Sequence, residues 1–348
     1  MNASSSLFSA TRAPNLEWLG RAVPETAIDP HIPIVDAHMH LWDHKTGYRY
    51  FLPEFADDAA QSNHRIDATV YVECHSMYRA DGPDHLKCIG ETEFAVGMAA
   101  QANSRKYTDC RVADVIVGYA DLTLGSRAGE ALEAHMEAAN GRFRGIRQRA
   151  KWDPDPAVRG AVHAGRSDLF ADKHFRQGLD VLTTMGLSFD ASVFHPQLMD
   201  LAKLAQAHPD SRIVVIHCGS PVGHASYRGR EEEVYADWMK GMKALAACPN
   251  VSIKLGGLLM CLGSYDFTAV PSPLNSEQLA QLWRPYLEPC VELFGAQRCM
   301  VSSNFPVDKA GVPYGTVWNM FKRVMAGCSV DEKNWIFNGT ARQFYRMT

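Results

Sequence analysis

Residues 33–43 read PIVDAHMHLWD, a short apolar run that ends in two histidines spaced two residues apart. The run has the length and composition of a buried strand. An open dinucleotide-binding sheet would normally place a glycine-rich turn directly after its first strand, and HMHLWD contains no glycine. The stretch therefore predicts a strand whose carboxyl end carries His38 and His40, and it argues against an open doubly wound sheet.

Similar apolar runs recur along the chain, separated by stretches with helical spacing. The predicted strands are 34–38, 68–73, 113–120, 143–148, 187–192, 213–217, 251–255 and 299–303. Helices are predicted at 175–185, 231–247 and 276–294, and in a segment that begins at Pro196. Strands that alternate with helices pair in parallel through crossover connections. Eight such units predict an α/β fold, a (β/α)8 TIM barrel with its chemistry at the carboxyl ends of the strands.

The domain organisation follows from the same pattern. Residues 1–30 are polar and proline-containing and predict an N-terminal extension that lies over the body or over a partner subunit. No linker interrupts the remainder, so residues 31–348 are predicted to form a single barrel.

Composition narrows the class of protein. The chain has 348 residues, of which 46% are hydrophobic, and a net charge of -4, so it is neither disordered nor basic enough for a sequence-blind nucleic-acid binder. No apolar run approaches the roughly 18 residues of a spanning helix. The nine cysteines form no CxxC pair, which is typical of reduced thiols. We expect a cytoplasmic protein with a small-molecule substrate and no nucleic-acid or membrane partner. The sequence leaves open whether it forms a homo-oligomer.

Histidines at two strand ends are the first candidate site. Residues two apart on a strand project to the same side, so His38 and His40 should point together into the barrel mouth. His217 ends the predicted sixth strand, at the same rim. Imidazoles in this arrangement can bind a divalent cation or a substrate oxygen. The alternative is a set of structural histidines with satisfied hydrogen bonds.

Five motifs carry a resemblance to a known family. They are VDAHMHLWD (35–43), FRGIRQ (143–148), VVIHCGSPVG (214–223), NVSIKLGG (250–257) and SSNFPVD (302–308). In this order they resemble the amidohydrolase superfamily, and more closely its amidohydrolase-2 type of metal-dependent barrel hydrolases, which includes sugar-acid and pyrone-dicarboxylate lactonases. The resemblance implies a distorted barrel, active-site roles for His38, His40 and His217, and a divalent metal, zinc or manganese, with a metal-free site as the alternative.

The chain departs from this family at the eighth strand, where Asn304 stands in place of an aspartate. In the family that aspartate takes the proton of the attacking water, and it can also bind the metal. An amide has no titrating proton and its oxygen is a weaker, uncharged ligand. If Asn304 occupies this catalytic position, the base must come from another residue.

The second strand offers a replacement. Tyr71, Glu73 and His75 alternate in VYVECHSMY, so Glu73 and His75 should face the mouth together. Glu73 could complete a metal site with the histidines of the first strand, or this pair could supply the catalytic base. Alternatively, Glu73 pairs with a barrel arginine as scaffolding. Asp308 is a further candidate, on a loop whose geometry is harder to predict.

Cations gather at other strand ends. Arg147, Arg149 and Lys151 are in phase with one another, and Lys254 lies in the seventh strand. An unpaired buried charge is costly, so these cations need partners. The candidate partners are Glu73, Asp121 and Asp190. Cations left without an internal partner, Arg147, Arg149 or Lys254, are candidates for binding a substrate carboxylate; the alternative is that they only hold the strands together.

Two further residues are candidate substrate contacts. Tyr48 lies in the loop after the first strand, and His195 follows the fifth strand, where it binds a ligand or only caps a helix. Cys218, although adjacent to His217, has the opposite strand parity and should point away from the barrel centre.

Together the motifs and cations predict a hydrolase that opens a carboxylated or sugar-acid lactone by water attack on the carbonyl. A metal-dependent decarboxylase, or an iron or manganese oxygenase, is the alternative within the same superfamily. A barrel that has lost catalysis and serves as a partner subunit is the third reading, based on Asn304.

Overall fold

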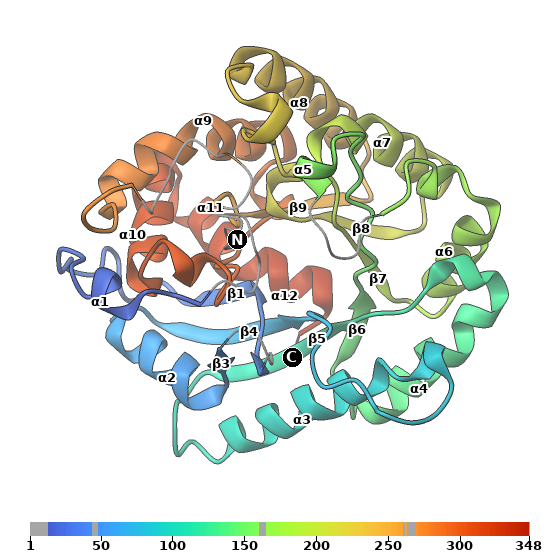
Figure 1. Cartoon of the computed structure of the whole chain (residues 1–348). Helices are drawn as coiled ribbons and strands as arrows, with labels where there is room; N and C mark the ends of the chain where they lie inside the picture. Colours follow the sequence, from blue (N-terminus) through green and yellow to red (C-terminus); the bar gives the residue numbers. More distant parts are fainter. Residues whose placement is uncertain (1–12, 44–47, 160–164, 260–261, 263–268, 348) are drawn as a thin grey trace, which may run out of the picture.

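The computed structural model describes residues 13–43, 48–159, 165–259, 262 and 269–347, and within them the chain forms a parallel barrel. Eight strands form one sheet in chain order, and Figure 1 shows them around a central axis with helices outside. The strands are β1 (Ile34–Met39), β4 (Ile66–Val72), β5 (Arg111–Gly118), β6 (Phe143–Ile146), β7 (Ser188–Ala191), β8 (Arg212–Val215), β9 (Val251–Leu255) and β10 (Cys299–Val301). All eight predicted strands and the (β/α)8 class are confirmed.

The ends of the first and last strands meet and nearly close the barrel. The backbone N–H of His40 donates to the carbonyl of Phe305 at 2.7 Å, and that of Asn304 donates to the carbonyl of His38 at 2.9 Å. The pairing of β1 with β4 shifts register between Asp36 and Met39. These contacts bring the ends of the first and eighth strands, which are far apart in sequence, to one rim.

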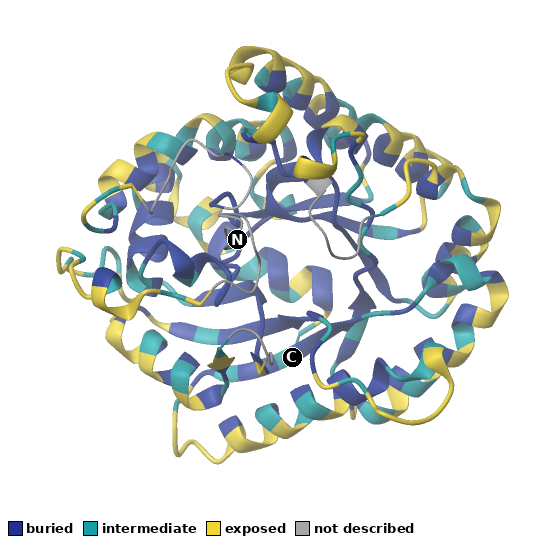
Figure 2. Ribbon diagram, viewed as in Figure 1, coloured by how far each residue is buried: buried dark blue, intermediate teal, exposed yellow. Residues whose placement is uncertain are grey.

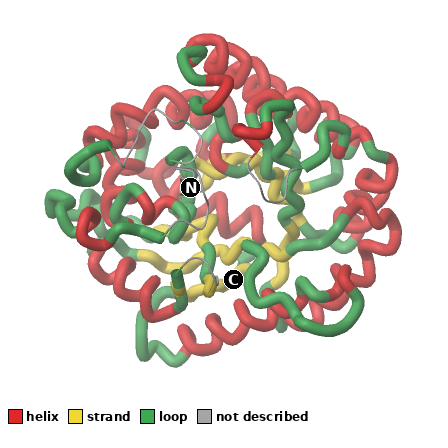
Figure 3. Tube along the Cα trace, in the orientation of Figure 1, coloured by secondary structure: helices red, strands yellow, loops and turns green. Residues whose placement is uncertain are grey.

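An outer layer of helices covers the sheet (Figure 3). Its main members are α2 (Leu52–Gln61), α3 (Ile89–Asn103), α4 (Ala128–Ala138), α6 (Lys173–Thr184), α7 (Leu198–Ala207), α8 (Glu231–Ala246), α9 (Ser276–Phe294) and α10 (Tyr314–Val324). The predicted helices correspond to α6, α8 and α9, and the segment from Pro196 forms a short 3-10 turn and then α7. The side chain of Asn275 caps α9 by accepting from the N–H of Gln278 at 2.9 Å.

The barrel interior is filled by small and β-branched side chains. Its buried cluster contains Val35, Ala37, Ala68, Val70, Val72, Val115, Val117, Val214 and Met300, with Phe344 and Tyr345 of α12 (Thr340–Tyr345) packed against them. Figure 2 shows the resulting contrast between buried strands and helices that are exposed only on their outer faces. The interior is therefore a packed core and not an open channel.

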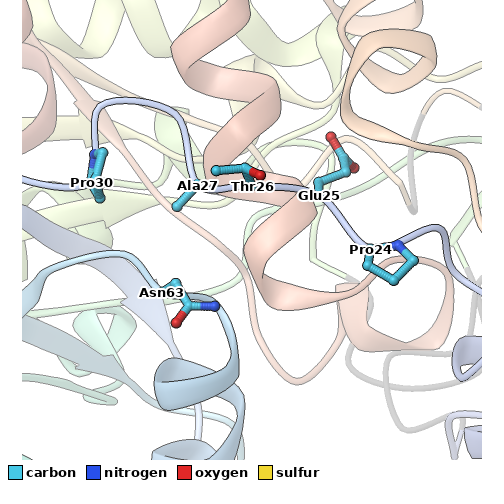
Figure 4. A pocket seen from close by; sticks show the side chains of 6 residues that line it. All are labelled: Pro24, Glu25, Thr26, Ala27, Pro30 and Asn63. Atoms are coloured by element: carbon cyan, nitrogen blue, oxygen red, sulfur yellow. The ribbon is translucent and has the colours of Figure 1, made fainter.

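The described part of the N-terminal extension lies against the body. The indole N–H of Trp18 donates to the carbonyl of Val270 at 2.8 Å, and the N–H of Ile28 donates to Asn319 of α10 at 2.8 Å. Two hollows border this segment, one of about 550 Å³ opposite Asn63 (Figure 4) and one of about 460 Å³. Residues 1–12 lie outside the described residues. No helix in the described part is both long and apolar enough to cross a membrane.

Candidate active site

The predicted site residues lie at the carboxyl ends of different strands. His38 is near the end of β1 and His40 follows it, Glu73 directly follows β4, and Arg147 directly follows β6. His217 lies two residues after β8 and Asn304 three residues after β10. Because all eight strands are parallel, these positions meet at one rim of the barrel.

Three imidazoles meet at this rim. The ring centroids of His38 and His40 are 4.9 Å apart, and those of His38 and His217 are 4.6 Å apart. All three side chains are buried. The Nδ1 atoms of His38 and His217 have no hydrogen-bond partner among the described residues, whereas Nδ1 of His40 lies 2.7 Å from the carbonyl of Val72. Nδ1 of His40 is therefore the donor, and its Nε2 keeps a free lone pair.

Burial keeps these imidazoles uncharged. It lowers the pKa of His40 to about 3, with Arg147 adding to the effect. Burial also lowers the pKa of His38 and of His217 well below the ordinary value, and nearby cations lower both further. At neutral pH the rim therefore presents neutral imidazoles, which can accept a proton or share a lone pair.

The position of His217 depends on a glycine that the sequence analysis did not single out. His217 and Cys218 both have left-handed backbone angles, with φ of 53° and 50°. Gly257, two residues beyond β9, has φ of 66°, and a Cβ atom on it would lie 1.9 Å from Nδ1 of His217. The motif NVSIKLGG already contained this signal, but only the fold shows what the second glycine faces.

Replacing Gly257 by Ala is expected to lower the free energy of unfolding by about 1–3 kcal/mol, because the added methyl overpacks His217 at a strained backbone position. Gly97→Ala on α3, where a Cβ meets nothing within 4 Å, is the matched control. That change should stabilise the chain by about 0.5–1 kcal/mol. Urea unfolding of both variants provides the measurement, and a Gly257→Ala variant as stable as Gly97→Ala would contradict the packing.

A buried ion pair links two strand ends. The guanidinium of Arg147 donates through Nε to Oε1 of Glu73 at 2.6 Å, and it also donates to the Glu73 carbonyl. Arg149 lies 3.8 Å from the same carboxylate, and Nε2 of His75 lies 3.6 Å from Oε2. Although burial raises the pKa of Glu73, the two arginines outweigh it and lower that pKa to about 2. Glu73 thus pairs with a barrel arginine, and its roles as a metal ligand or as part of the catalytic base stay predictions.

The alternation predicted for Tyr71, Glu73 and His75 holds only in part. Glu73 and His75 do lie together, as predicted, but the hydroxyl of Tyr71 donates to Glu91 of α3, on the outer side of the sheet. The regular strand ends at Val72, and His75 has a left-handed φ of 60°. The side-chain phase therefore changes between Tyr71 and Glu73, because strict alternation applies only inside a strand.

Asn304 forms a pair with the next acid along the chain. The amide of Asn304 donates to Oδ1 of Asp308 at 2.8 Å, and Asp308 has no exposed surface. Its Oδ2 has no hydrogen-bond partner among the described residues. Burial raises the pKa of Asp308 to about 8. Asp308, the further candidate for the base, is thus buried and held by Asn304.

Lys254 does not lie where a substrate contact was expected. Its side chain is fully buried, and its ammonium pairs with Oδ2 of Asp190 at 2.7 Å and lies over the ring of Tyr345 on α12. An internal partner thus already neutralises this cation, as it does Arg147. Asp121, the third expected partner, instead accepts from the amide of Gln148 at 3.0 Å.

The remaining candidates line the surroundings of the rim. The hydroxyl of Tyr48 donates to the carbonyl of Pro306 at 2.8 Å, and its ring packs on Trp42, which stacks on His40. His195 begins a short helical turn, its Nδ1 accepts from the N–H of Val222 at 3.3 Å, and its ring packs on Tyr227. Tyr48 thus borders the imidazoles, whereas His195 is held by the loop after β8.

The nearly closed parallel barrel is that of a (β/α)8 protein, and its imidazoles and guanidiniums form a polar site at the strand ends. The amidohydrolase family model matches residues 35–347, so the chain belongs to the amidohydrolase family. It is 32% identical over 328 residues to the uncharacterized protein y4mH of Sinorhizobium fredii, covering 91% of this chain and 99% of that protein.

Two further proteins are similar over most of the chain. L-fucono-1,5-lactonase of Burkholderia ambifaria is 26% identical over 333 residues, which cover 90% of this chain and 95% of that protein. The fold is shared with a crystal structure of an amidohydrolase from Burkholderia multivorans with bound zinc. The TM-score is 0.69 at 23% identity, with 90% of this chain and 99% of that chain covered.

The donors of this chain do not form a ready metal site. No group of three or more His, Cys, Asp or Glu side chains in the described ranges is arranged to hold a metal ion. Glu73 is engaged by Arg147, whose Nη1 also lies 3.4 Å from Nε2 of His38, and a cation at that distance opposes a second cation. Metal binding by His38, His40, His217 and Glu73 stays a prediction.

Proposed function

We propose that this protein hydrolyses a lactone that carries a carboxylate. The observation that supports this most directly is the charge pattern at the rim, where Arg147 and Arg149 share the single carboxylate of Glu73 next to three neutral imidazoles. Glu91 also acts on Arg149, and burial raises the pKa of Glu91 to about 7, so at neutral pH it offsets only part of the charge of Arg149. A substrate carboxylate would complete the balance on Arg149.

The reaction would proceed by water attack on the lactone carbonyl carbon. The proton of the water passes to the ionised carboxylate of Asp308, whose Oδ1 accepts a hydrogen bond from the amide of Asn304. Arg147 and the neutral His38 stabilise the negative charge that develops on the carbonyl oxygen. The intermediate then expels the ring oxygen, which takes the proton from Asp308, so one lactone and one water give one hydroxy acid.

Asp308 suits this role better than an ordinary aspartate does. A general base is most effective when its pKa lies near the working pH, and burial raises the pKa of Asp308 to about 8. Its second oxygen has no partner in the described part of the chain. Asn304 would then orient the base, in place of acting as the base.

A lactone panel tests the proposal. The purified protein is assayed by acid release on 2-pyrone-4,6-dicarboxylate and on L-fucono-1,5-lactone, with zinc, with manganese and with a chelator. We expect turnover of the carboxylated lactone, a loss of at least about 100-fold in His38→Ala and in His217→Ala, and a loss in Arg149→Gln that is confined to the carboxylated substrate. Absence of turnover on both lactones, or a fully active His38→Ala/His217→Ala double variant, would overturn the assignment.

A further inference from the structure

The buried carboxylate of Glu91 holds the segment that carries Glu73 and His75. Glu91 lies in the first turn of α3 and is only 2% exposed. Its Oε1 accepts from the backbone N–H of Cys74 at 2.7 Å and from that of Ser76 at 3.2 Å. One oxygen thus binds the two N–H groups on either side of His75, in the manner of a backbone anion nest.

The same oxygen reaches the strand before this segment and the thiol within it. The hydroxyl of Tyr71 donates to Oε1 at 2.9 Å, and Sγ of Cys74 donates to it at 3.3 Å. Four donors from residues 71–76 therefore converge on one atom of α3. This is the region in which the side-chain phase changes and β4 ends.

The segment needs such a support because its backbone is not at a relaxed minimum. His75 and Met77 have left-handed φ angles of 60° and 56°, which side-chain-bearing residues rarely adopt. Gly90, next to Glu91, lets α3 approach so closely that a Cβ there would lie 2.4 Å from the carbonyl of Met77. Contacts with α3 thus support the left-handed backbone conformation of this segment.

We propose that Glu91 is a positioning residue: its carboxylate shapes residues 73–77 and thereby places Glu73 against Arg147 and His75 at the rim. Without this acceptor, the two buried N–H groups lose their partner and the left-handed conformation of His75 loses its support. Glu73 would then move relative to Arg147, although neither residue touches Glu91. The link to catalysis rests on the proposed function; the placement of the segment does not.

Four variants separate positioning from general stability. Glu91→Gln keeps an accepting oxygen, and Glu91→Leu removes it. If the Leu variant does not fold, Glu91→Asp takes its place, because the shorter side chain moves the oxygen away from the segment. Thr92→Val is the matched control on the same turn, because Thr92 is equally buried but its hydroxyl bonds to His135 at 2.8 Å and not to the segment. The first readout is alkylation of Cys74 by iodoacetamide, followed on its peptide by mass spectrometry.

We expect alkylation of Cys74 to be at least tenfold faster in Glu91→Leu or Glu91→Asp than in wild type, and within threefold of wild type in Glu91→Gln and Thr92→Val. If the wild type turns over a lactone, kcat/KM should fall at least tenfold in Glu91→Leu or Glu91→Asp. It should stay within threefold of wild type in Glu91→Gln and Thr92→Val. Unchanged alkylation in Glu91→Leu or Glu91→Asp overturns the proposal, and faster alkylation with unchanged kcat/KM overturns the link to the site. If wild type hydrolyses neither lactone, the proposed function fails while the alkylation result still decides the placement.

Discussion

Replacing Asp308 by Asn is expected to lower kcat/KM for lactone hydrolysis by about 100- to 10,000-fold, the usual contribution of a general base. The substitution keeps an oxygen that can accept from Asn304, so the pair should survive while the proton acceptor is lost. Because the carboxylate accepts a proton only when ionised, and its pKa is raised to about 8, wild-type kcat/KM should increase with pH up to about 8 and then level off. The variant should lose this rise.

The exchange of the two side chains provides the control. The double variant Asn304→Asp/Asp308→Asn has the same composition and places an acid at position 304, where the resemblance implies one. We expect its kcat/KM to be at least about tenfold higher than that of Asp308→Asn, since the acid is again at the rim. Full activity of Asp308→Asn, with the pH dependence intact, would show that another group accepts the proton, and the neutral imidazoles would be the next candidates.

Replacing Arg147 by Met is expected to have the largest effect on stability, a loss of about 3–5 kcal/mol in the free energy of unfolding. The reason is that Glu73 is fully buried and, among the described residues, would keep only the ion pairs with Arg149 at 3.8 Å and with His75 at 3.6 Å. Removing one partner of a buried pair leaves a charge that water cannot solvate. Urea unfolding at neutral pH gives the value.

Two control variants test whether this loss of stability comes from the buried ion pair. Arg147→Met/Glu73→Gln removes both charges and should be more stable than Arg147→Met alone. Arg142→Met removes an arginine that is partly exposed and lies 3.2 Å from Asp114, and it should cost less than about 1 kcal/mol. Equal losses in Arg147→Met and Arg142→Met would mean that the Glu73 pair contributes no more than a surface contact.

Strand positions and same-side histidines could be predicted because they depend on local periodicity. Apolar runs of strand length separated by helical spacing gave all eight strands, and the spacing of His38 and His40 placed both rings on one side. Parallel pairing then required His217 to reach the same rim. These inferences need only the geometry of single elements and the direction of the sheet.

Lys254 shows where such reasoning stops. Its place in the predicted seventh strand made it a candidate for the rim, but that place does not give its depth along the barrel axis. The side chain lies beside Tyr345 of the C-terminal helix α12 and is neutralised by Asp190, so it holds the interior together. No local pattern shows that the end of the chain returns to fill the barrel.

The sequence by itself determined the barrel, its rim and the residue types that gather there, because periodicity and strand direction are properties of short segments. The tertiary structure alone decided which charges neutralise one another, that Asp308 sits against Asn304, that Gly257 leaves room for His217, and that Glu91 supports the segment around His75. Those outcomes depend on distances between side chains from different elements and on how far each is removed from water, and neither quantity is encoded in the spacing of residues along the chain.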